Sequence, residues 1–325
     1  MTELWIAILL GVIEGVTEFL PISSTGHLLL AKHWLEGIAD LESDFWTRFA
    51  VFIQIGAILA VVVYFRERIR SLLFNHSSRG KRGSASAPEP ATAQEPFSAL
   101  GSGKNRQSEG PAAGAASAVA TEDRTTHLQD PIRAHPILLL AVATVPVLVV
   151  GFLLHDIVER YLETPRIIAA ALLIGGVLMI VIEKLRKTVR AETVEDVTLG
   201  QALFIGCVQV LSAVFPGTSR SAATIMGGLL AGLSRPAAAE FSFFLAIPSM
   251  FAACSFSLIK MVQAGRGLTL QQALLLAVGT LTSYLVAWGV IAAFMSYIRR
   301  YSFVPFAVYR IFLGLVVLWL VRHTA

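Results

Sequence analysis

The sequence predicts an all-α polytopic membrane protein with six transmembrane helices and two re-entrant pairs of half-helices in an inverted repeat. Of its 325 residues, 55% are hydrophobic and only 15% are charged, and the mean hydropathy is +0.68. A soluble domain is usually about 45–50% apolar and about 25% charged. Long apolar runs and two proline-broken apolar stretches complete the evidence. With a net charge of only +4 we expect no nucleic-acid partner.

Six apolar stretches are long enough to cross the hydrocarbon core of a bilayer, which takes roughly 20 helical residues. They are continuous rather than alternating, so we expect helices instead of barrel strands. They lie at about 46–65, 136–154, 166–183, 237–258, 270–297 and 303–321.

Two further apolar stretches, at about 4–35 and 199–234, are interrupted by Pro21 and Pro216. Proline removes a backbone donor and disfavours the helical conformation of the preceding residue. We therefore expect each stretch to form two half-helices joined by a short turn.

The two broken stretches resemble each other, and three spanning segments follow each of them. An offset of 195 aligns the prolines and five polar pairs: Glu14 with Gln209, Thr17 with Ser212, Ser23 with Thr218, Ser24 with Ser219 and Thr25 with Arg220. Three spans per copy make the second copy inverted, an architecture typical of transporters, with the site at the repeat interface. We expect one membrane domain over 1–325, with repeats at 1–190 and 197–325.

Lysine and arginine predict the orientation, because they gather in cytoplasmic loops. Ten of them lie in residues 66–135, four more follow the third span between Lys184 and Arg190, and Arg299 and Arg300 follow the fifth. All three regions fall on one side, which we assign to the cytoplasm. Between about 75 and 130 Gly, Ser, Ala and Pro dominate, which predicts a disordered cytoplasmic loop.

Glu14 and Glu18 are four residues apart, so they share one face of the first half-helix. A carboxylate at the centre of a bilayer costs on the order of 2.5–3.5 kcal/mol. One glutamate near an interface could snorkel or cap a helix, but two that lead into a helix break indicate function. We expect them to transfer protons or to bind a metal ion.

Ser23, Ser24 and Thr25 stand at the expected start of the next half-helix, where hydroxyl residues favour capping and free N–H groups favour anions. His27 lies three residues beyond Ser24. The neighbouring hydroxyl and carboxylates favour a role for His27 as acid, base or phosphate ligand over simple packing.

Arg220, the only charged residue between 199 and 234, needs an anionic partner, either a glutamate or a phosphate. Its planar guanidinium suits phosphate oxygens. We expect further substrate contacts from Thr218, Ser219 and Ser221. Arg310 is a second intramembrane charge, for which a phosphate contact and outward snorkelling remain open. Gln54 and Glu240 are weaker candidates.

The segments EGVTEFLPISSTGH, FIQIGAILAVVVYF, FPGTSRSAAT and AAEFSFFLAIPSM make the chain similar to the undecaprenyl-diphosphatase family linked to bacitracin resistance. The resemblance covers nearly the whole chain except the loop at about 75–130. It implies a bacterial inner-membrane enzyme that hydrolyses undecaprenyl diphosphate to undecaprenyl phosphate and phosphate at the periplasmic face, recycling the lipid carrier for peptidoglycan. It implies six spans and two re-entrant pairs.

Carried onto matching positions, the resemblance implies a catalytic set of Glu14, Glu18, Ser24, His27 and Arg220. It also implies dependence on Mg²⁺ or Ca²⁺, which Glu14 and Glu18 would hold. Bacitracin is then an indirect partner that competes for the same lipid, and a homodimer stays one option for the oligomeric state. Whether Ser24 or a water attacks the phosphorus is left open.

Two other classes of membrane protein are alternatives to this family: a second type of lipid phosphatase and a lipid flippase. Type-2 phosphatidic acid phosphatases also contain SR, but their required His and Asp positions hold Met226 and Leu230 here. A lipid-phosphate flippase fits the inverted repeat. Against it, Glu18 aligns with Ala213 and Arg220 with Thr25, and this asymmetry favours an enzyme.

Overall fold

The computed structural model describes residues 2–35, 44–74, 134–158, 164–186, 188–263 and 268–324. The loop predicted at about 75–130 lies outside these ranges. The described residues form helices and one isolated bridge between Ala191 and Leu233, without a β-strand. The all-α prediction is therefore confirmed.

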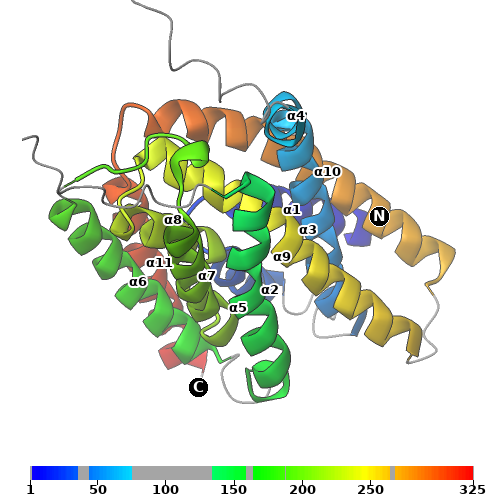
Figure 1. The fold of residues 1–325 in the computed structure, drawn as a ribbon. Helices are drawn as coiled ribbons and strands as arrows, with labels where there is room; N and C mark the ends of the chain where they lie inside the picture. The colour runs from blue at the N-terminus through cyan, green and yellow to red at the C-terminus, as the bar shows by residue number, and fades with distance from the viewer. Residues whose placement is uncertain are drawn as a thin grey trace, which may run out of the picture. The chain divides into compact units, whose positions relative to one another are not determined.

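All six predicted apolar stretches are helical (Figure 1). They form α3 (Asp44–Tyr64), α5 (Pro136–Ile157), α6 (Pro165–Leu185), α9 (Arg235–Gln263), α10 (Leu270–Ile298) and α11 (Val304–Thr324). Pro146 and Pro248 lie inside α5 and α9 without ending them. Within the described ranges, five helices are long and apolar enough to cross a membrane.

A sixth crossing results if α3 is counted together with α4 (Arg66–Phe74), which bends away from it by 67°. Helix α4 was not predicted, because its charged residues follow the span expected at about 46–65 and indicated only a cytoplasmic segment. Arg68 on α4 donates to Glu240 on α9 at 2.8 Å and to Glu195 in the short helix η3 (Val194–Asp196) at 2.7 Å. Glu240, a weaker candidate for the site, is therefore part of an ion pair between α4 and α9.

Both proline-broken stretches are interrupted where the sequence predicts. The first forms α1 (Thr2–Thr17) and α2 (Ser24–Leu35), and the second forms α7 (Leu199–Val214) and α8 (Arg220–Leu230). The two half-helices of each pair contact each other instead of continuing as one helix. Whether the pairs are re-entrant in a bilayer stays a prediction.

Helices that correspond in the two predicted repeats make corresponding contacts. Helix α1 packs along α10. Helix α7, which corresponds to α1, packs along α5, which corresponds to α10. Helices α6 and α11, which also correspond, pack against each other, as do α3 and α9. Such paired contacts are the pattern expected of a duplicated chain, although the boundaries at 190 and 197 stay predictions.

Gly11 and Gly206 occupy the same position in the two copies and permit these contacts. A Cβ on Gly11 would lie 2.6 Å from the carbonyl oxygen of Gly279 on α10. A Cβ on Gly206 would overlap the backbone of Ala143 on α5. Glycine at this position lets each first half-helix approach its neighbour closely, as small residues do in membrane helix pairs.

Candidate active site

The two breaks place the starts of α2 and α8 near each other in the protein. The Ser221 hydroxyl at the start of α8 donates to the Leu20 carbonyl in the first break at 2.9 Å. Ser23 and Ser219 cap the two helices, since their hydroxyls accept from the amides of Gly26 and Ala222, each at 3.3 Å. The capping role expected among Ser23, Ser24 and Thr25 thus falls to Ser23, and Ser219, expected as a substrate contact, has the same role at α8.

Both capping serines have a positive φ, 74° at Ser23 and 69° at Ser219. Residues other than glycine rarely adopt this conformation, and such strain gathers at functional sites. Gly217, which precedes Ser219 by two residues, also has a positive φ of 92°, and a Cβ there would meet the backbone of Ile168.

These caps correct the alignment used in the sequence analysis. Ser23 follows Pro21 by two residues, whereas Ser219 follows Pro216 by three, because the second turn holds one more residue before its cap. In three dimensions Ser23 therefore corresponds to Ser219, and Ser24 to Arg220. The pairing of Ser24 with Ser219 was wrong by one residue.

Glu18 joins the first residues of both half-helices. The Ser24 hydroxyl donates to Oε2 of Glu18 at 2.8 Å, and Nη2 of Arg220 lies 3.5 Å from its Oε1. The side chains of Glu18 and Arg220 are only 9% and 11% exposed, so little water screens this ion pair. Arg220 also donates through Nη1 to the Ser242 carbonyl at 3.1 Å, and its guanidinium lies 5.5 Å from the centre of the Phe19 ring.

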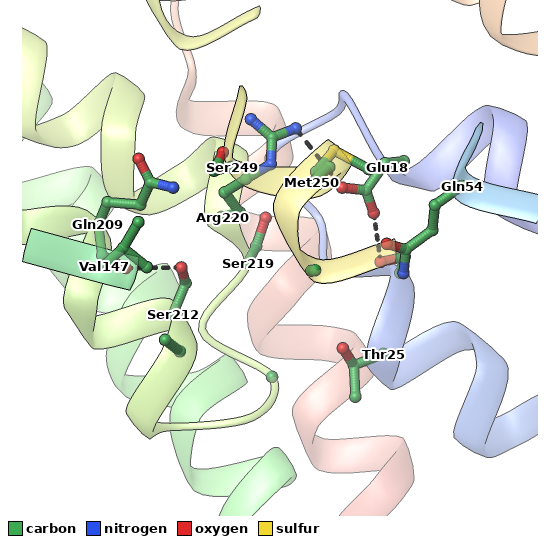
Figure 2. Close-up of a pocket in the computed structure, with 14 residues that line it drawn as sticks. Glu18, Thr25, Gln54, Val147, Gln209, Ser212, Ser219, Arg220, Ser249 and Met250 are labelled. Atoms are coloured by element: carbon green, nitrogen blue, oxygen red, sulfur yellow. Dashed lines mark hydrogen bonds and ion pairs between the residues drawn. The ribbon is translucent and has the colours of Figure 1, made fainter. Parts of the chain in front are cut away.

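A cavity of about 260 Å³ opens beside these groups. Five predicted site residues line it: Glu18, Ser24, Thr25, Ser219 and Arg220. In Figure 2, Glu18 and Gln54 lie on one side and Gln209 and Ser212 on the other, with Arg220 and Ser219 between them. One carboxylate, one guanidinium and several hydroxyls therefore converge on a single space large enough for a phosphate.

Four polar residues of the cavity were missed or ranked low. Gln54 was a weak candidate, Gln209 and Ser212 appeared only as partners in the repeat alignment, and Ser249 was not singled out. The available signal was a polar side chain in an otherwise apolar helix, which in a membrane is expensive and often functional. Ser249 follows Pro248 directly and donates to the Leu245 carbonyl at 2.6 Å, so it could equally be taken as a local helix feature.

Glu14 lies behind the cavity rather than in its wall. Its side chain is fully buried, and neither carboxylate oxygen has a hydrogen-bond partner among the described residues. A buried carboxylate in this state needs a proton or a cation. The described residues contain no group of three His, Cys, Asp or Glu side chains able to hold a metal. A cation bound by Glu14 and Glu18 would thus take its other ligands from water and substrate oxygens, as Mg²⁺ commonly does.

His27 also lies outside the wall of the cavity. Its Nδ1 is 2.7 Å from the Ser23 carbonyl, and its Nε2 is 2.7 Å from the hydroxyl of Tyr309 on α11, against which the ring stacks. A carbonyl can only accept, so Nδ1 carries a hydrogen and a neutral ring accepts at Nε2 from Tyr309. His27 therefore contacts the strained cap that precedes Ser24.

The remaining predicted substrate contacts are distributed around the second turn. Ser221 is fully buried and links the two breaks, and Thr218 donates its amide to the Phe215 carbonyl at 3.1 Å without lining the cavity. Arg310 is fully buried, so it does not snorkel outward. Its Nη2 donates to the carbonyls of Ala171 and Gly217, at 3.3 and 3.2 Å, which fastens α11 to the second turn.

An apolar groove of about 500 Å³ adjoins the polar cavity. The two spaces share Val147, Ala213, Ser249 and Ala253 in their walls. Beyond these, the groove is lined by Leu148, Gly151, Phe152, Val158, Ala252, Phe256 and Ser257 from the α5 and α9 region. A ligand with a charged head and an apolar tail could therefore occupy both spaces at once.

The chain is similar to known proteins over nearly its whole length. A family described as bacitracin resistance protein BacA matches residues 7–316. A relative from Koribacter versatilis (strain Ellin345), named undecaprenyl-diphosphatase, is 37% identical over 99% of this chain and 100% of its own length. Proteins of the same name from Sorangium cellulosum (strain So ce56) and Thermoanaerobacter sp. (strain X514) are 41% and 39% identical, over 97% and 98% of this chain and 85% and 96% of their own lengths.

Proposed function

This chain belongs to the bacitracin resistance protein BacA family, and from that premise we propose that it hydrolyses undecaprenyl diphosphate to undecaprenyl phosphate and inorganic phosphate. The observation that carries this proposal is the contact of one buried carboxylate, Glu18, with both Ser24 and Arg220 in a polar cavity. A nucleophile, a base and a phosphate-binding cation are thus close together. A flippase needs no such arrangement.

We assign the roles from these contacts. Arg220, with Ser219 and the free N–H groups at the starts of α2 and α8, binds the diphosphate and stabilises the charge of the transition state. Glu18 accepts the hydroxyl proton of Ser24 while the Ser24 oxygen attacks the terminal phosphorus. The bond from that phosphorus to the bridging oxygen breaks, undecaprenyl phosphate leaves, and water then hydrolyses the phosphoserine. In the alternative route Glu18 deprotonates a water that Ser24 positions.

A divalent cation, Mg²⁺ or Ca²⁺, fits the unpartnered oxygens of Glu14 and the adjacent carboxylate of Glu18. When bound, it would neutralise part of the charge of the diphosphate and the two glutamates. Arg310 and Thr218 remain candidates for further phosphate contacts only if the second turn rearranges when substrate binds.

The adjoining groove supports a polyprenyl substrate, because its wall is mostly apolar and it begins at the polar cavity. The diphosphate would lie among Glu18, Ser24 and Arg220 while the first isoprene units lie between α5 and α9. Bacitracin would then act on this protein indirectly, by competing for the same lipid.

The chain is a multi-pass membrane protein, and the family is found in the bacterial inner membrane. We further propose that the cavity opens to the periplasm and that the segment at 75–130 is cytoplasmic. The distribution of lysine and arginine supports this orientation. A homodimer remains an option for the oligomeric state.

The test is phosphate release from undecaprenyl diphosphate by purified protein in detergent. We expect Glu18→Gln, Ser24→Ala and Arg220→Ala each to lower kcat at least about a hundredfold, as expected when a catalytic acid–base or oxyanion contact is removed. Glu67→Gln and Ser296→Ala are matched controls, because both residues are exposed on the surface away from the cavity. Both controls should retain activity within about twofold of the unmodified protein.

Each outcome separates a different part of the proposal. Activity lost to a chelator and restored by Mg²⁺ or Ca²⁺ would support the cation, whereas full activity with EDTA would contradict it. If Ser24→Ala alone stays active, water is the nucleophile. If the unmodified protein releases no phosphate, the hydrolase assignment fails and the flippase becomes the better hypothesis.

A further inference from the structure

The opposite end of α8 from the active site carries a second cavity, of about 250 Å³. It lies between the end of α6 and the end of α8, and its polar side chains are Arg186, Thr188 and Arg190. Helix α8 has 11 residues, so about 16 Å of helix separates the two cavities at a rise of about 1.5 Å per residue. The hydrolysis described above does not use this cavity.

The charge at this cavity is not neutralised within the described residues. Arg235 is paired with Glu183, whose side chain is 5% exposed. Neither Arg186 nor Arg190 has an ion-pair partner in the part of the chain that the structure describes, and Nη1 of Arg186 is buried without a hydrogen bond there. Burial, and then repulsion from Arg235, lower the pKa of the Arg186 guanidinium although Glu183 opposes the change.

The position of Arg186 and Arg190 at this cavity is not explained by an interaction with the C-terminal carbonyls of α8. Cations do stabilise helix C-termini by interacting with the last carbonyls. At the end of α8, however, backbone amides already donate to the carbonyls of Gly227, Gly228 and Leu229, and Nε2 of Gln201 donates to Ala231. The guanidinium groups of Arg186 and Arg190 are therefore available for another ligand.

The walls of the cavity favour a ligand that comes from the bilayer. Leu185 and Leu230, at 64% and 57% exposed, flank the two arginines. Gly232, with a φ of 89°, keeps the space open, because a Cβ there would lie 3.3 Å from the stem of Arg190. Basic pockets between membrane helices on the cytoplasmic side are a known setting for acidic lipid headgroups.

We propose that the cavity formed by Arg186, Arg190 and the end of α8 binds the phosphate of an anionic phospholipid headgroup. The two guanidinium groups bind the phosphate oxygens, and the acyl chains lie along the exposed leucines. Because the lysine and arginine distribution predicts the cytoplasmic side for this end of α6, the lipid would come from the inner leaflet. The site would anchor the C-terminal end of the half-helix whose first residue is Arg220.

The test follows thermal unfolding by tryptophan fluorescence in detergent as dioleoyl phosphatidylglycerol, dioleoyl phosphatidylcholine or inorganic phosphate is added. A ligand that binds only the folded protein stabilises it by RT ln(1 + [L]/Kd), so Tm rises with ligand concentration above Kd. We expect phosphatidylglycerol to raise Tm, and the concentration needed for a given rise to be roughly 25-fold higher for Arg186→Gln/Arg190→Gln, since each basic residue near an anionic surface contributes about fivefold.

Two further double variants make the result decisive. Arg299→Gln/Arg300→Gln removes the same charge from exposed positions and should respond as the unmodified protein does. Arg186→Lys/Arg190→Lys should respond partially, which identifies a folded protein with a weakened site. All of them should release phosphate from undecaprenyl diphosphate within about twofold of the unmodified rate, because the cavity is remote from Ser24.

Two outcomes would overturn the proposal. If phosphatidylglycerol stabilises Arg186→Gln/Arg190→Gln as well as it stabilises the unmodified protein, the lipid binds elsewhere. If inorganic phosphate alone reproduces the stabilisation and the same variant abolishes it, the site recognises a free anion rather than a lipid headgroup.

Discussion

Glu18 has two hydrogen-bonding oxygens, and each serves a different half of the protein. Oε2 accepts from Ser24 in the first repeat, and Oε1 lies at ion-pair distance from Arg220 in the second. The two contacts hold the carboxylate in one orientation, and a phosphate bound by Arg220 would lie next to the carboxylate that contacts Ser24. At the scale of one residue, substrate binding and activation of the nucleophile are thus coupled.

His27 gives a prediction at the same scale, because its contacts favour a positioning role. It binds the Ser23 carbonyl and Tyr309, and it does not line the cavity. We expect His27→Gln to lower kcat roughly tenfold to a hundredfold by displacing Ser24, since small misplacements are costly. The rising limb of kcat against pH should persist in this variant, because His27 contacts Ser23 and Tyr309 rather than Ser24.

Tyr309→Phe is the matched control for His27, since it keeps the stacked ring and removes only the hydroxyl that His27 contacts. Its effect on kcat should be smaller than that of His27→Gln. Disappearance of the rising limb in His27→Gln would show that the histidine takes the proton itself, and the positioning role would be wrong.

At the scale of elements, Gly11 and Gly206 determine how closely α1 and α7 approach α10 and α5. We expect Gly11→Ala and Gly206→Ala each to destabilise the protein by about 2 kcal/mol or more, because the added Cβ meets a backbone carbonyl. The measurement is the Tm of purified protein in detergent. Gly289→Ala is the control, since that helical glycine faces open space and alanine favours helix by up to about 1 kcal/mol.

An equal loss of Tm in Gly289→Ala would mean that the alanines act through something other than the helix contact. A loss in only one of Gly11→Ala and Gly206→Ala would mean that the repeat positions are not equivalent in packing.

The groove between α5 and α9 gives a second prediction about elements. Ala253 borders both the groove and the polar cavity, so Ala253→Trp should block the path of the lipid tail. We expect KM for undecaprenyl diphosphate to rise roughly tenfold, while kcat/KM for the shorter farnesyl diphosphate changes much less. Leu178→Trp, on an exposed face of α6, is the control. Equal losses with both substrates would place the tail elsewhere.

The sequence predicted the helices and five of the residues that line the cavity because both depend on local signals. Apolar length defined the spans, and proline defined the breaks at Pro21 and Pro216. The bend into α4 could not be predicted in this way, because Arg68 of α4 is paired with Glu195 and Glu240, which are far away in the chain.

The details of the site were harder to predict, because they depend on turn geometry. One additional residue before Ser219 shifts the second half-helix, so that Arg220 rather than Ser219 corresponds to Ser24. The direction in which each side chain points could not be predicted from the sequence either. Ser23 and Ser24 are neighbours, yet Ser23 caps a helix and Ser24 lines the cavity. A pattern of residue types does not distinguish these roles without the dihedral angles.

At the scale of the whole molecule, the repeat requires the two ends of each spanning helix to face opposite compartments. Helix α10 tests this directly, since Leu268 precedes it and Arg300 follows it, both exposed. In a Cys207→Ser background, Cys254 remains buried and should not react. We expect a membrane-impermeant maleimide to label Leu268→Cys in intact spheroplasts, and to label Arg300→Cys only after the membrane is permeabilised.

Lysine and arginine favour the cytoplasm, so Arg300, Arg186 and the segment at 75–130 should share one side, and the cavity at Glu18 should open toward the other. The reverse labelling pattern would put undecaprenyl diphosphate hydrolysis on the cytoplasmic face. Labelling of both cysteines from outside would be incompatible with α10 as a single crossing, and therefore with the inverted repeat itself.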